Sequence, residues 1–548
     1  MDQAQLGIPL TLLNWLLVLA PIVVLLVLLA VFHWAAPDAG ALGMFTAAVI
    51  SLLAFRTPWM TVAVAGAKGV WDAVFILYVV WAALILYQVT RRAGAFAALR
   101  QGIMHFSRNE LFLVMAFGWV FASFLQGIAG FGAPIAVVAP LLVALRVRPV
   151  YAVVIPLIGH AWAKMFGTLA VGWLATLAVV DLENATESAF QSGILLWIPN
   201  LAAGFTIAWF YGRGRGIAHA WPLVLIISLL QGGVQLLLTL WDPVLSAFLA
   251  GTVALLALYP LSRWKRYSEP AADIEERPAM AETAQAADVE GEHAPMGLAM
   301  AALPYAVLTF VAILVLVVPP IKSALAQFEI GLPFPQVQTG YGVVREGEDP
   351  YLPFSPLTHP GTFLLVASLV GWVVYRARGY YAQYQEGLGE RPKGFWSDLA
   401  EDAVPSSVSV IAFLVMSKLM DHSGQTHLLA LGIREVAPPT VYAFAANWIG
   451  VLGAFMTSSS TSSNILFAPI QQTVAQLEGL TEPTIIAAQN AGGAIGNVIA
   501  PANLALGTGT AGIIGREGEV LRRALPWTIA VATLVGLATI LLNGRYLV

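Results

Sequence analysis

The stretch QGIAGFGAP at residues 126–134 interrupts an apolar segment, 110–146, whose two ends are helical in pattern. Three glycines and a proline break a helix, and backbone polar groups exposed to lipid cost several kcal/mol each. The stretch must therefore be enclosed by protein or line a watery cavity. Arginines stand before and after the segment, at Arg108, Arg146 and Arg148, so both of its ends lie on the same side of a membrane. The sequence predicts a re-entrant helical hairpin at 110–146, entered from the cytoplasm.

A second stretch, TSSSTSSN at 457–464, interrupts segment 438–476 in the same way. Seven hydroxyls and an amide cannot face lipid, so this tip must also be enclosed. Aligning the two segments places Trp119 on Trp448 and Gly167 on Gly496. An odd number of predicted crossings separates the hairpins, so the two halves of the chain are predicted to be inverted repeats. Broken helices in inverted repeats are typical of secondary transporters.

The composition agrees with a membrane protein. Of 548 residues, 59% are hydrophobic and 11% charged, whereas soluble domains carry about 25% charged residues. This excludes a soluble enzyme, a nucleic-acid-binding protein and a disordered protein. Apolar runs long enough for a ~30 Å hydrocarbon core recur along the chain. We predict an all-α polytopic membrane protein with about twelve transmembrane helices plus the two hairpins. The predicted crossings are 12–33, 40–55, 71–88, 150–179, 191–211, 220–239, 243–260, 296–318, 361–376, 403–420, 484–510 and 526–545.

The distribution of charge in the loops predicts the orientation, because Lys and Arg remain in cytoplasmic loops. Basic residues gather in alternate loops, and the loops between them are acidic. Both termini are then extracytoplasmic in a multi-pass protein of the plasma (inner) membrane. Residues 268–295 are polar and rich in Pro, Ala and Glu, which predicts a disordered cytoplasmic linker. It divides the chain into a first half, 1–267, and a second half, 296–548.

Each hairpin is followed by a helix with polar residues at membrane depth. His160 and Lys164 are four residues apart, on one face of the first of these helices. A cation in mid-membrane costs on the order of 3 kcal/mol or more, and neither hairpin region offers an intramembrane carboxylate to neutralise it. We expect the carboxylate of a substrate to do so, although a lysine that snorkels to an interface is the structural alternative.

His160 is the candidate for proton coupling. The charge of Lys164 disfavours its protonation in an empty site, and a bound carboxylate favours it. A buried histidine with a purely structural role is the alternative. The hydroxyls of the second tip and its backbone N–H groups suit a small carboxylate, or else they only stabilise the break. The candidate substrate-binding residues are Gln126, Gly130, Phe131, Gly132, His160, Lys164, Ser459, Ser460, Thr461, Asn464, Gln489, Asn490 and Asn497.

No catalytic residue, metal site or cofactor is predicted, and the absence of cysteine excludes thiolate chemistry. Five other ionisable residues fall near predicted span ends, where solvated or interfacial roles are expected. They are Asp72, Glu110, Lys418, Asp421 and His422.

Three motifs together resemble the bacterial L-lactate permease family: FLQGIAGFGAP (124–134), SSSTSSNILFAPIQ (458–471) and QNAGGAIGNVIAPANLALG (489–507). The resemblance covers nearly the whole chain. It implies a proton-coupled importer of L-lactate, and often glycolate, in the plasma membrane. The wider superfamily that the chain resembles uses an elevator mechanism. The family usually has a glutamate where this chain has Gln126 and an asparagine where it has Ser460, and the helix with His160 and Lys164 also departs from the family pattern. We therefore expect a divergent member.

Four hypotheses follow. The leading one is a secondary active transporter that imports a small monocarboxylate with a proton. A sodium-coupled organic anion transporter is the alternative, because the tip hydroxyls and Asn497 can also hold Na⁺. An intramembrane enzyme would need a nucleophile–base pair or a metal cluster, and a single midplane histidine without a carboxylate partner argues against it. A passive channel is the fourth hypothesis, because inverted re-entrant hairpins also build pores, and turnover or voltage-clamp data would separate it from a transporter. The expected partners are the carboxylate, a proton or Na⁺, and the lipid bilayer. No nucleic acid is expected, and a homodimer is left open.

Overall fold

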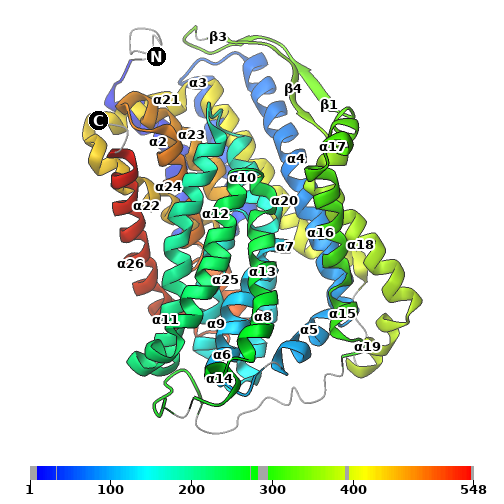
Figure 1. Cartoon of the computed structure of the whole chain (residues 1–548). Helices are drawn as coiled ribbons and strands as arrows, with labels where there is room; N and C mark the ends of the chain where they lie inside the picture. The colour runs from blue at the N-terminus through cyan, green and yellow to red at the C-terminus, as the bar shows by residue number, and fades with distance from the viewer. Residues whose placement is uncertain are drawn as a thin grey trace.

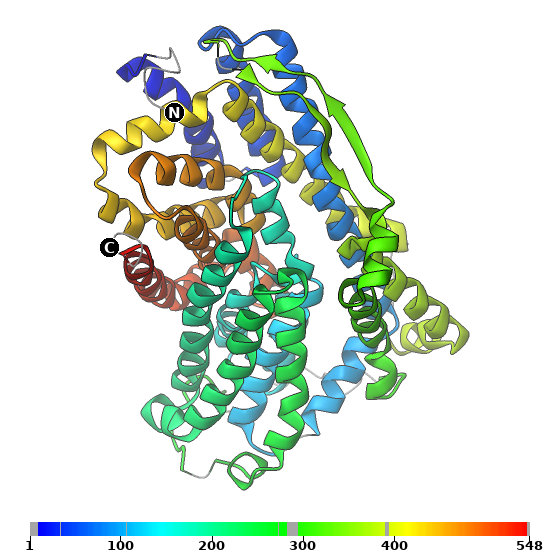
Figure 2. The ribbon, with the colours of Figure 1, turned by 45° about the horizontal axis from the view of Figure 1, so that its top comes forward.

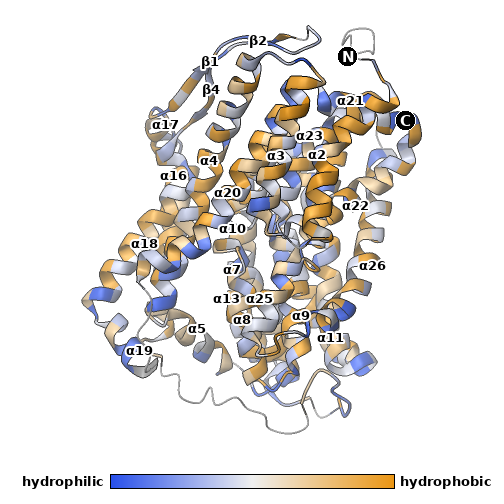
Figure 3. Ribbon diagram, turned by 180° about the vertical axis from the view of Figure 1, so that it is seen from behind, coloured by the Kyte–Doolittle hydropathy of each residue, from blue (hydrophilic) through white to orange (hydrophobic). Residues whose placement is uncertain are grey.

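The computed structural model describes residues 9–32, 34–105, 107–271, 273–281, 294–342, 344–388 and 394–544. The chain folds into a bundle of tilted helices (Figure 1). Within the described residues, ten helices are long and apolar enough to cross a membrane, or up to twelve if each bent pair is one span. Apolar residues occupy most of the length of these helices (Figure 3). The predicted polytopic helical architecture is confirmed at this level.

The first hairpin follows α2 (Leu12–Ala30), α3 (Ala36–Leu53), α4 (Trp59–Arg92) and α5 (Ala95–Met104). Its first arm consists of α6 (Glu110–Met115), the π-helical turn η1 (Ala116–Phe121) and α7 (Ala122–Ile128), and its second arm is α8 (Ala133–Ala144). The arms lie side by side, because a Cβ atom on Gly118 would lie 3.5 Å from Leu142 Cδ1. The first arm, 110–128, is by itself long enough to cross a membrane. The hairpin is thus observed, and its re-entrant character remains a prediction.

The second hairpin pairs α22 (Pro439–Thr457) with α23 (Ser460–Glu478). Its arms are joined by hydrogen bonds from Gln471 Nε2 to Ala446 O (2.8 Å) and from Ser463 Oγ to Gly450 O (2.9 Å). Ser458 makes the turn with a left-handed φ of 54°. In Figure 1, α23 lies towards one end of the molecule, whereas α6 and α8 lie towards the other. The two hairpins therefore approach the middle from opposite ends.

The helix after each hairpin is broken. The predicted single helix 150–179 is instead α9 (Pro149–Gly159), the 3₁₀ turn η2 (Ala161–Ala163) and α10 (Gly167–Leu177), bent by 56°. The expectation that His160 and Lys164 share one regular helix face is therefore wrong. Thr168, Leu169 and Ala170 have φ of 51°, 50° and 63°, which no right-handed helix can continue. The helix after the second hairpin is divided into α24 (Glu482–Gly496) and α25 (Pro501–Thr510). The break lies at the glycines and the proline from which it was predicted.

The remaining helices form two groups. On one flank α4 packs against α18 (Pro360–Ala377) and α20 (Phe395–His422), and α18 against α16 (Leu303–Val317). On the other flank α24 packs against α11 (Ala185–Ser228) and α26 (Glu517–Gly544). The two flanks are separated across the molecule in Figures 1 and 2. The smaller elements are η3 (Leu229–Gly233), α12 (Val234–Thr239), η4 (Pro243–Leu245), α13 (Ser246–Ser262), α14 (Lys265–Ser268), α15 (Leu298–Ala301), α17 (Pro319–Ala326), η5 (Pro356–Thr358), α19 (Tyr380–Leu388) and α21 (Gln425–Val436).

Two small antiparallel sheets correct the purely helical prediction. Strand β1 (Ile330–Phe334) pairs with β4 (Glu348–Phe354), and β2 (Val337–Gln338) pairs with β3 (Val344–Arg345). The segment is fastened along α4 by Lys68 Nζ to Glu348 Oε1 (2.8 Å) and by Trp71 Nε1 to Leu352 O (3.1 Å). Strands were not predicted in this segment because it is rich in proline and glycine.

The start of the predicted linker contacts the helices near it. Met280 forms an isolated β-bridge with Val147, and Asp273 lies 3.3 Å from His219. Residues 272 and 282–293 of the linker lie outside the described residues. The division of the chain at this linker remains a prediction.

A buried ion pair overturns the expectation of solvated or interfacial roles for Asp72 and Lys418, whereas Glu110 and Asp421 are partly exposed. Asp72 is 1% exposed, and its Oδ2 lies 3.1 Å from Lys418 Nζ. Lys418 also donates to Ala178 O at 2.9 Å, just beyond the end of α10. His422 is buried as well. Asp72 and Lys418 face each other from helices far apart in the sequence, and such a pairing cannot be predicted from span boundaries.

Candidate functional site

Both hairpin tips and both helix breaks line one cavity of about 650 Å³. The first tip and the α9–α10 break form one side of it, and the second tip and the α24–α25 break another. A further wall comes from α20 and from the turn between α2 and α3. The predicted site residues that line the cavity are Gln126, Phe131, Gly132, His160, Lys164, Ser459, Ser460, Thr461 and Asn497.

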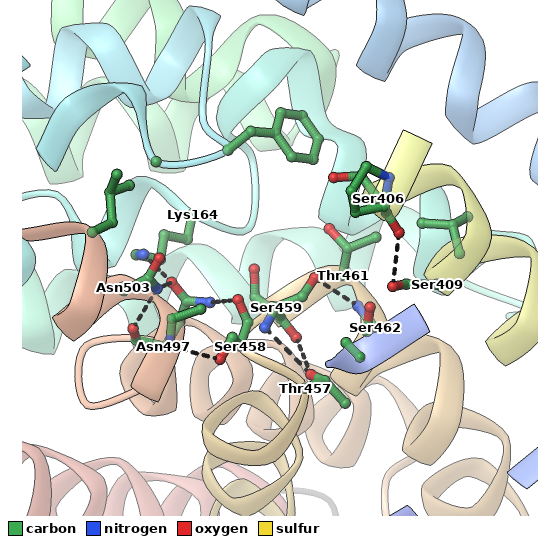
Figure 4. A pocket seen from close by; sticks show the side chains of 18 of the residues that line it. Lys164, Ser406, Ser409, Thr457, Ser458, Ser459, Thr461, Ser462, Asn497 and Asn503 are labelled. Atoms are coloured by element: carbon green, nitrogen blue, oxygen red, sulfur yellow. Dashed lines mark hydrogen bonds between the residues drawn. The ribbon is translucent and has the colours of Figure 1, made fainter. Parts of the chain in front are cut away.

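Lys164 lies in the break between η2 and α10 and is 8% exposed. Its ammonium donates to Asn497 Oδ1, which also accepts from Asn503 Nδ2 at 2.7 Å. Asn497 Nδ2 in turn donates to Ser458 O at 3.0 Å, so one amide joins the lysine to the second tip (Figure 4). Among the described residues, no carboxylate lies within 4 Å of this ammonium. The one carboxylate among the described residues that line the cavity, Asp402, forms no ion pair with this ammonium.

The hydroxyls of the second tip divide between structure and cavity. Thr457 Oγ1 bonds within the turn, and Ser459 Oγ caps α23 by accepting from Ser462 N at 3.1 Å. In these two residues the hydroxyl therefore stabilises the turn and the start of α23, which is the structural role given above as the alternative to substrate binding. In the described part of the chain, the hydroxyls of Ser460 and Thr461 have no hydrogen-bond partner. Ser460 and Thr461 are the first two residues of the 19-residue helix α23, which begins beside the cavity. Free N–H groups and the helix dipole favour an anion at this helix end.

The first tip depends on its glycines. Gly132 has a φ of 86°, and a Cβ atom there would lie 2.4 Å from Leu506 Cδ2. Gly130 N donates to Thr168 Oγ1 at 2.8 Å, which ties the tip to the left-handed turn of α10. Gly130 lines a second cavity, of about 400 Å³, that shares Phe131 and Gly132 with the larger one.

His160 ends α9 and is 1% exposed. Its Nδ1 hydrogen-bonds with the carbonyl oxygen of Pro156. Because a carbonyl oxygen only accepts, Nδ1 carries a proton. The other ring nitrogen, Nε2, is then the atom that can gain or lose one.

Three predicted site residues do not line either cavity. Asn464, Gln489 and Asn490 are fully buried. Gln489 Nε2 donates to Asn464 Oδ1 at 3.3 Å, and Asn490 Nδ2 donates to Ser192 Oγ at 3.1 Å. These bonds hold the second hairpin to α24, and α24 to α11. A role in substrate contact remains a prediction for them.

The sequence analysis missed the wall contributed by α20. Asp402, Ser406 and Ser409 line the cavity, and the two serines lie across it from Lys164 (Figure 4). Their spacing places them on one helix face, which was the available signal. Thr168, Ser458 and Asn503 were also missed.

A multi-pass helical bundle in which discontinuous helices enclose a polar cavity has the architecture of a membrane transporter. Residues 14–545 match the model of the L-lactate permease family, and the chain belongs to that family. It is 26% identical to the glycolate permease GlcA of Escherichia coli over 96% of this chain and 95% of that one. It is 27% identical to the L-lactate permease of Halalkalibacterium halodurans over 95% of each chain. These relatives are permeases, so the chain is a transporter and not an enzyme.

Among solved structures, the chain is similar to the YdaH transporter of Alcanivorax borkumensis. The TM-score is 0.46 at 15% identity, over 87% of this chain and 88% of that one. It is also similar to MtrF of Neisseria gonorrhoeae, with a TM-score of 0.35 at 15% identity, over 96% of this chain and 94% of that one.

Proposed function

We propose that this protein is a secondary active transporter that imports a small monocarboxylate with a proton across the plasma (inner) membrane. L-Lactate and glycolate are the first substrates to test, because they are the compounds for which its relatives are named. The family match supports a small organic acid as cargo.

The observation that carries the proposal is the charge of the cavity. Lys164 is the one lysine or arginine among the described residues that line it, and its partner is a neutral amide. A single ammonium suits a single carboxylate, whereas a dicarboxylate would require a second cation. The partner-free hydroxyls of Ser460 and Thr461 can bind the substrate's own hydroxyl or its second carboxylate oxygen.

His160 is our candidate for the coupling proton. Its Nε2 is free to take a proton, and the carboxylate that binds Lys164 also stabilises an imidazolium in the same cavity. Substrate binding and proton uptake then favour each other, which is the thermodynamic requirement for symport.

We further propose an elevator cycle built on inverted repeats. In this cycle the two hairpins, α9–α10 and α24–α25 move as one unit against the group of α4, α18 and α20. The breaks at the tips and the approach of the hairpins from opposite ends support this view. Both termini are extracytoplasmic in the proposed orientation.

Sodium coupling is the second candidate. Hydroxyl and amide oxygens suit a hard cation, and Ser460 and Thr461 have hydroxyls to offer. Uptake of labelled L-lactate and glycolate into proteoliposomes separates the two. Accumulation driven by an inward pH gradient without Na⁺ supports proton symport, and accumulation that needs a Na⁺ gradient at constant pH supports the alternative. If neither compound enters faster than into protein-free vesicles, the proposed function is wrong.

A further inference from the structure

Asp402 is the one carboxylate among the described residues that line either cavity, and it lines both. It lies on α20, on the same helix face as Ser406 and Ser409, which face Lys164 across the larger cavity (Figure 4). The two cavities share Phe131 as well, and that side chain is 42% exposed between them. Asp402 therefore stands where the two cavities meet.

The partner of Asp402 is unlike those of other carboxylates on α4 and α20. Asp72 pairs with Lys418, Asp398 with Arg92 at 2.8 Å, and Asp421 with Arg345 at 2.7 Å. A cation at this distance holds a carboxylate in its ionised form. Asp402 Oδ2 instead accepts a hydrogen bond from the neutral amide of Gln88, with Nε2 at 3.3 Å.

Gln88 can serve both protonation states of its partner. The side chain is fully buried, and its Oε1 has no hydrogen-bond partner among the described residues. Rotation of the amide by half a turn exchanges Nε2 and Oε1. In one position the amide donates to a carboxylate, and in the other it accepts from a carboxylic acid. Protonation of Asp402 would thus exchange which atom of the Gln88 amide lacks a partner, without adding a second one.

We infer that Asp402 is a second proton-binding group of the transport cycle, an inference that rests on the proposed proton symport. The carboxylate takes one proton from the larger cavity and becomes a neutral acid. It then releases the same proton through the smaller cavity, and no other bond changes. The smaller cavity is lined by Tyr87 and Arg91, in the last two turns of α4, at the end of the molecule predicted to be cytoplasmic.

The charged groups around Asp402 come from two helices. Arg91 and Tyr87 of α4, and Asp398 and Glu401 of α20, are close enough to act on it electrostatically. Arg91 forms no ion pair with Asp402 within 4 Å in the described part of the chain. The first tip presents the ring of Phe131 to the shared boundary.

Asp402→Asn in the full-length protein in proteoliposomes tests the inference. Two activities are compared: accumulation of labelled L-lactate or glycolate driven by a pH gradient, and exchange of labelled for unlabelled substrate at equal pH. Exchange needs no net proton movement, so it also reports whether the variant is folded. We expect Asp402→Asn to exchange substrate and to lose accumulation, with no proton uptake when substrate is added. Asp402→Glu should keep a titrating group and retain both activities.

Glu401→Gln is the matched control, because Glu401 adjoins Asp402 and lines neither cavity. It should retain both exchange and accumulation, with at most a shift in their pH dependence, because its charge acts on Asp402. Accumulation by Asp402→Asn with unchanged pH dependence would overturn the inference while leaving the proposed function intact. Loss of exchange together with accumulation would also overturn it, since Asp402 would then act in binding or folding. Absence of both activities in the wild type would instead refute the proposed function and, with it, this inference.

Discussion

Two buried lysines in this protein should respond to the same substitution in opposite ways. Lys164 faces the cavity with only the Asn497 amide as its partner, whereas Lys418 neutralises Asp72 at 3.1 Å. Replacement by methionine removes the charge and keeps most of the apolar stem. If Lys164 binds substrate and Lys418 stabilises the fold, Lys164→Met should lose binding and Lys418→Met should lose stability.

The size of the binding loss follows from the burial of Lys164, which is 8% exposed. Truncating one partner of a buried, hydrogen-bonded charge pair costs roughly 2–5 kcal/mol. At about 3 kcal/mol, Kd for the monocarboxylate rises roughly 150-fold, because each ~1.4 kcal/mol is a factor of ten.

The same substitution should not destabilise the empty protein. Asn497 Oδ1 keeps the hydrogen bond from Asn503 Nδ2 at 2.7 Å, so no buried acceptor is left without a donor. An uncompensated cation at membrane depth, which costs on the order of 3 kcal/mol, is also removed. We therefore expect Lys164→Met to unfold at the wild-type temperature or above.

Binding is measured with radiolabelled L-lactate or glycolate on protein in nanodiscs, at equal pH on both faces. Thermal unfolding is followed by the fluorescence of the 17 tryptophans. Lys418→Met leaves Asp72 buried without its cation, which typically costs about 3–5 kcal/mol, and its folded fraction should bind with wild-type Kd. Wild-type affinity in Lys164→Met would remove this lysine from the site. Weak binding by folded Lys418→Met would show that the assay does not separate the two roles.

Three further variants test other parts of the site. His160→Gln should flatten the pH dependence of uptake while changing Kd for the substrate little; an unchanged pH profile would leave His160 a packing role. Thr168→Ala removes the acceptor for Gly130 N and should lower stability by about 1–3 kcal/mol, seen as a lower unfolding temperature that Thr168→Ser restores. Gly159→Ala should prevent folding, because its Cβ would lie 2.1 Å from a backbone oxygen of the first hairpin, whereas Gly66→Ala in α4 meets nothing within 4 Å. Equal yields of these two glycine variants would refute the packing argument.

The helix breaks could be predicted because their causes are local. Glycines and a proline end α7 before residue 129, and the hydroxyl-rich stretch that begins at Thr457 marks the second tip. The α24–α25 break likewise follows from Gly496 and Pro501. Each of these signals lies within a few residues, so no knowledge of tertiary packing is needed to interpret it.

The α20 wall could not be predicted in this way. Which face of a helix meets a cavity is decided by its neighbours, and Asp402 lines the cavity because α20 packs on α4 and α3. The bend at His160 also escaped prediction, since its neighbours Ala161–Ala163 are compatible with a helix. Pairs such as Asp72 and Lys418 depend on contacts between distant parts of the sequence.

In the proposed elevator cycle, the isolated charge of Lys164 should determine which steps are slow. An empty site carries an ammonium that only amide oxygen stabilises, and moving it past apolar framework helices is costly. A bound carboxylate cancels this charge, so the loaded site should move more easily than the empty one, and exchange should outpace net uptake. Net uptake requires the return of the empty site with its charge uncompensated, because Asp402 lies on α20, in the group of helices that stays fixed in the proposed cycle. That return should therefore be the slow step of net uptake.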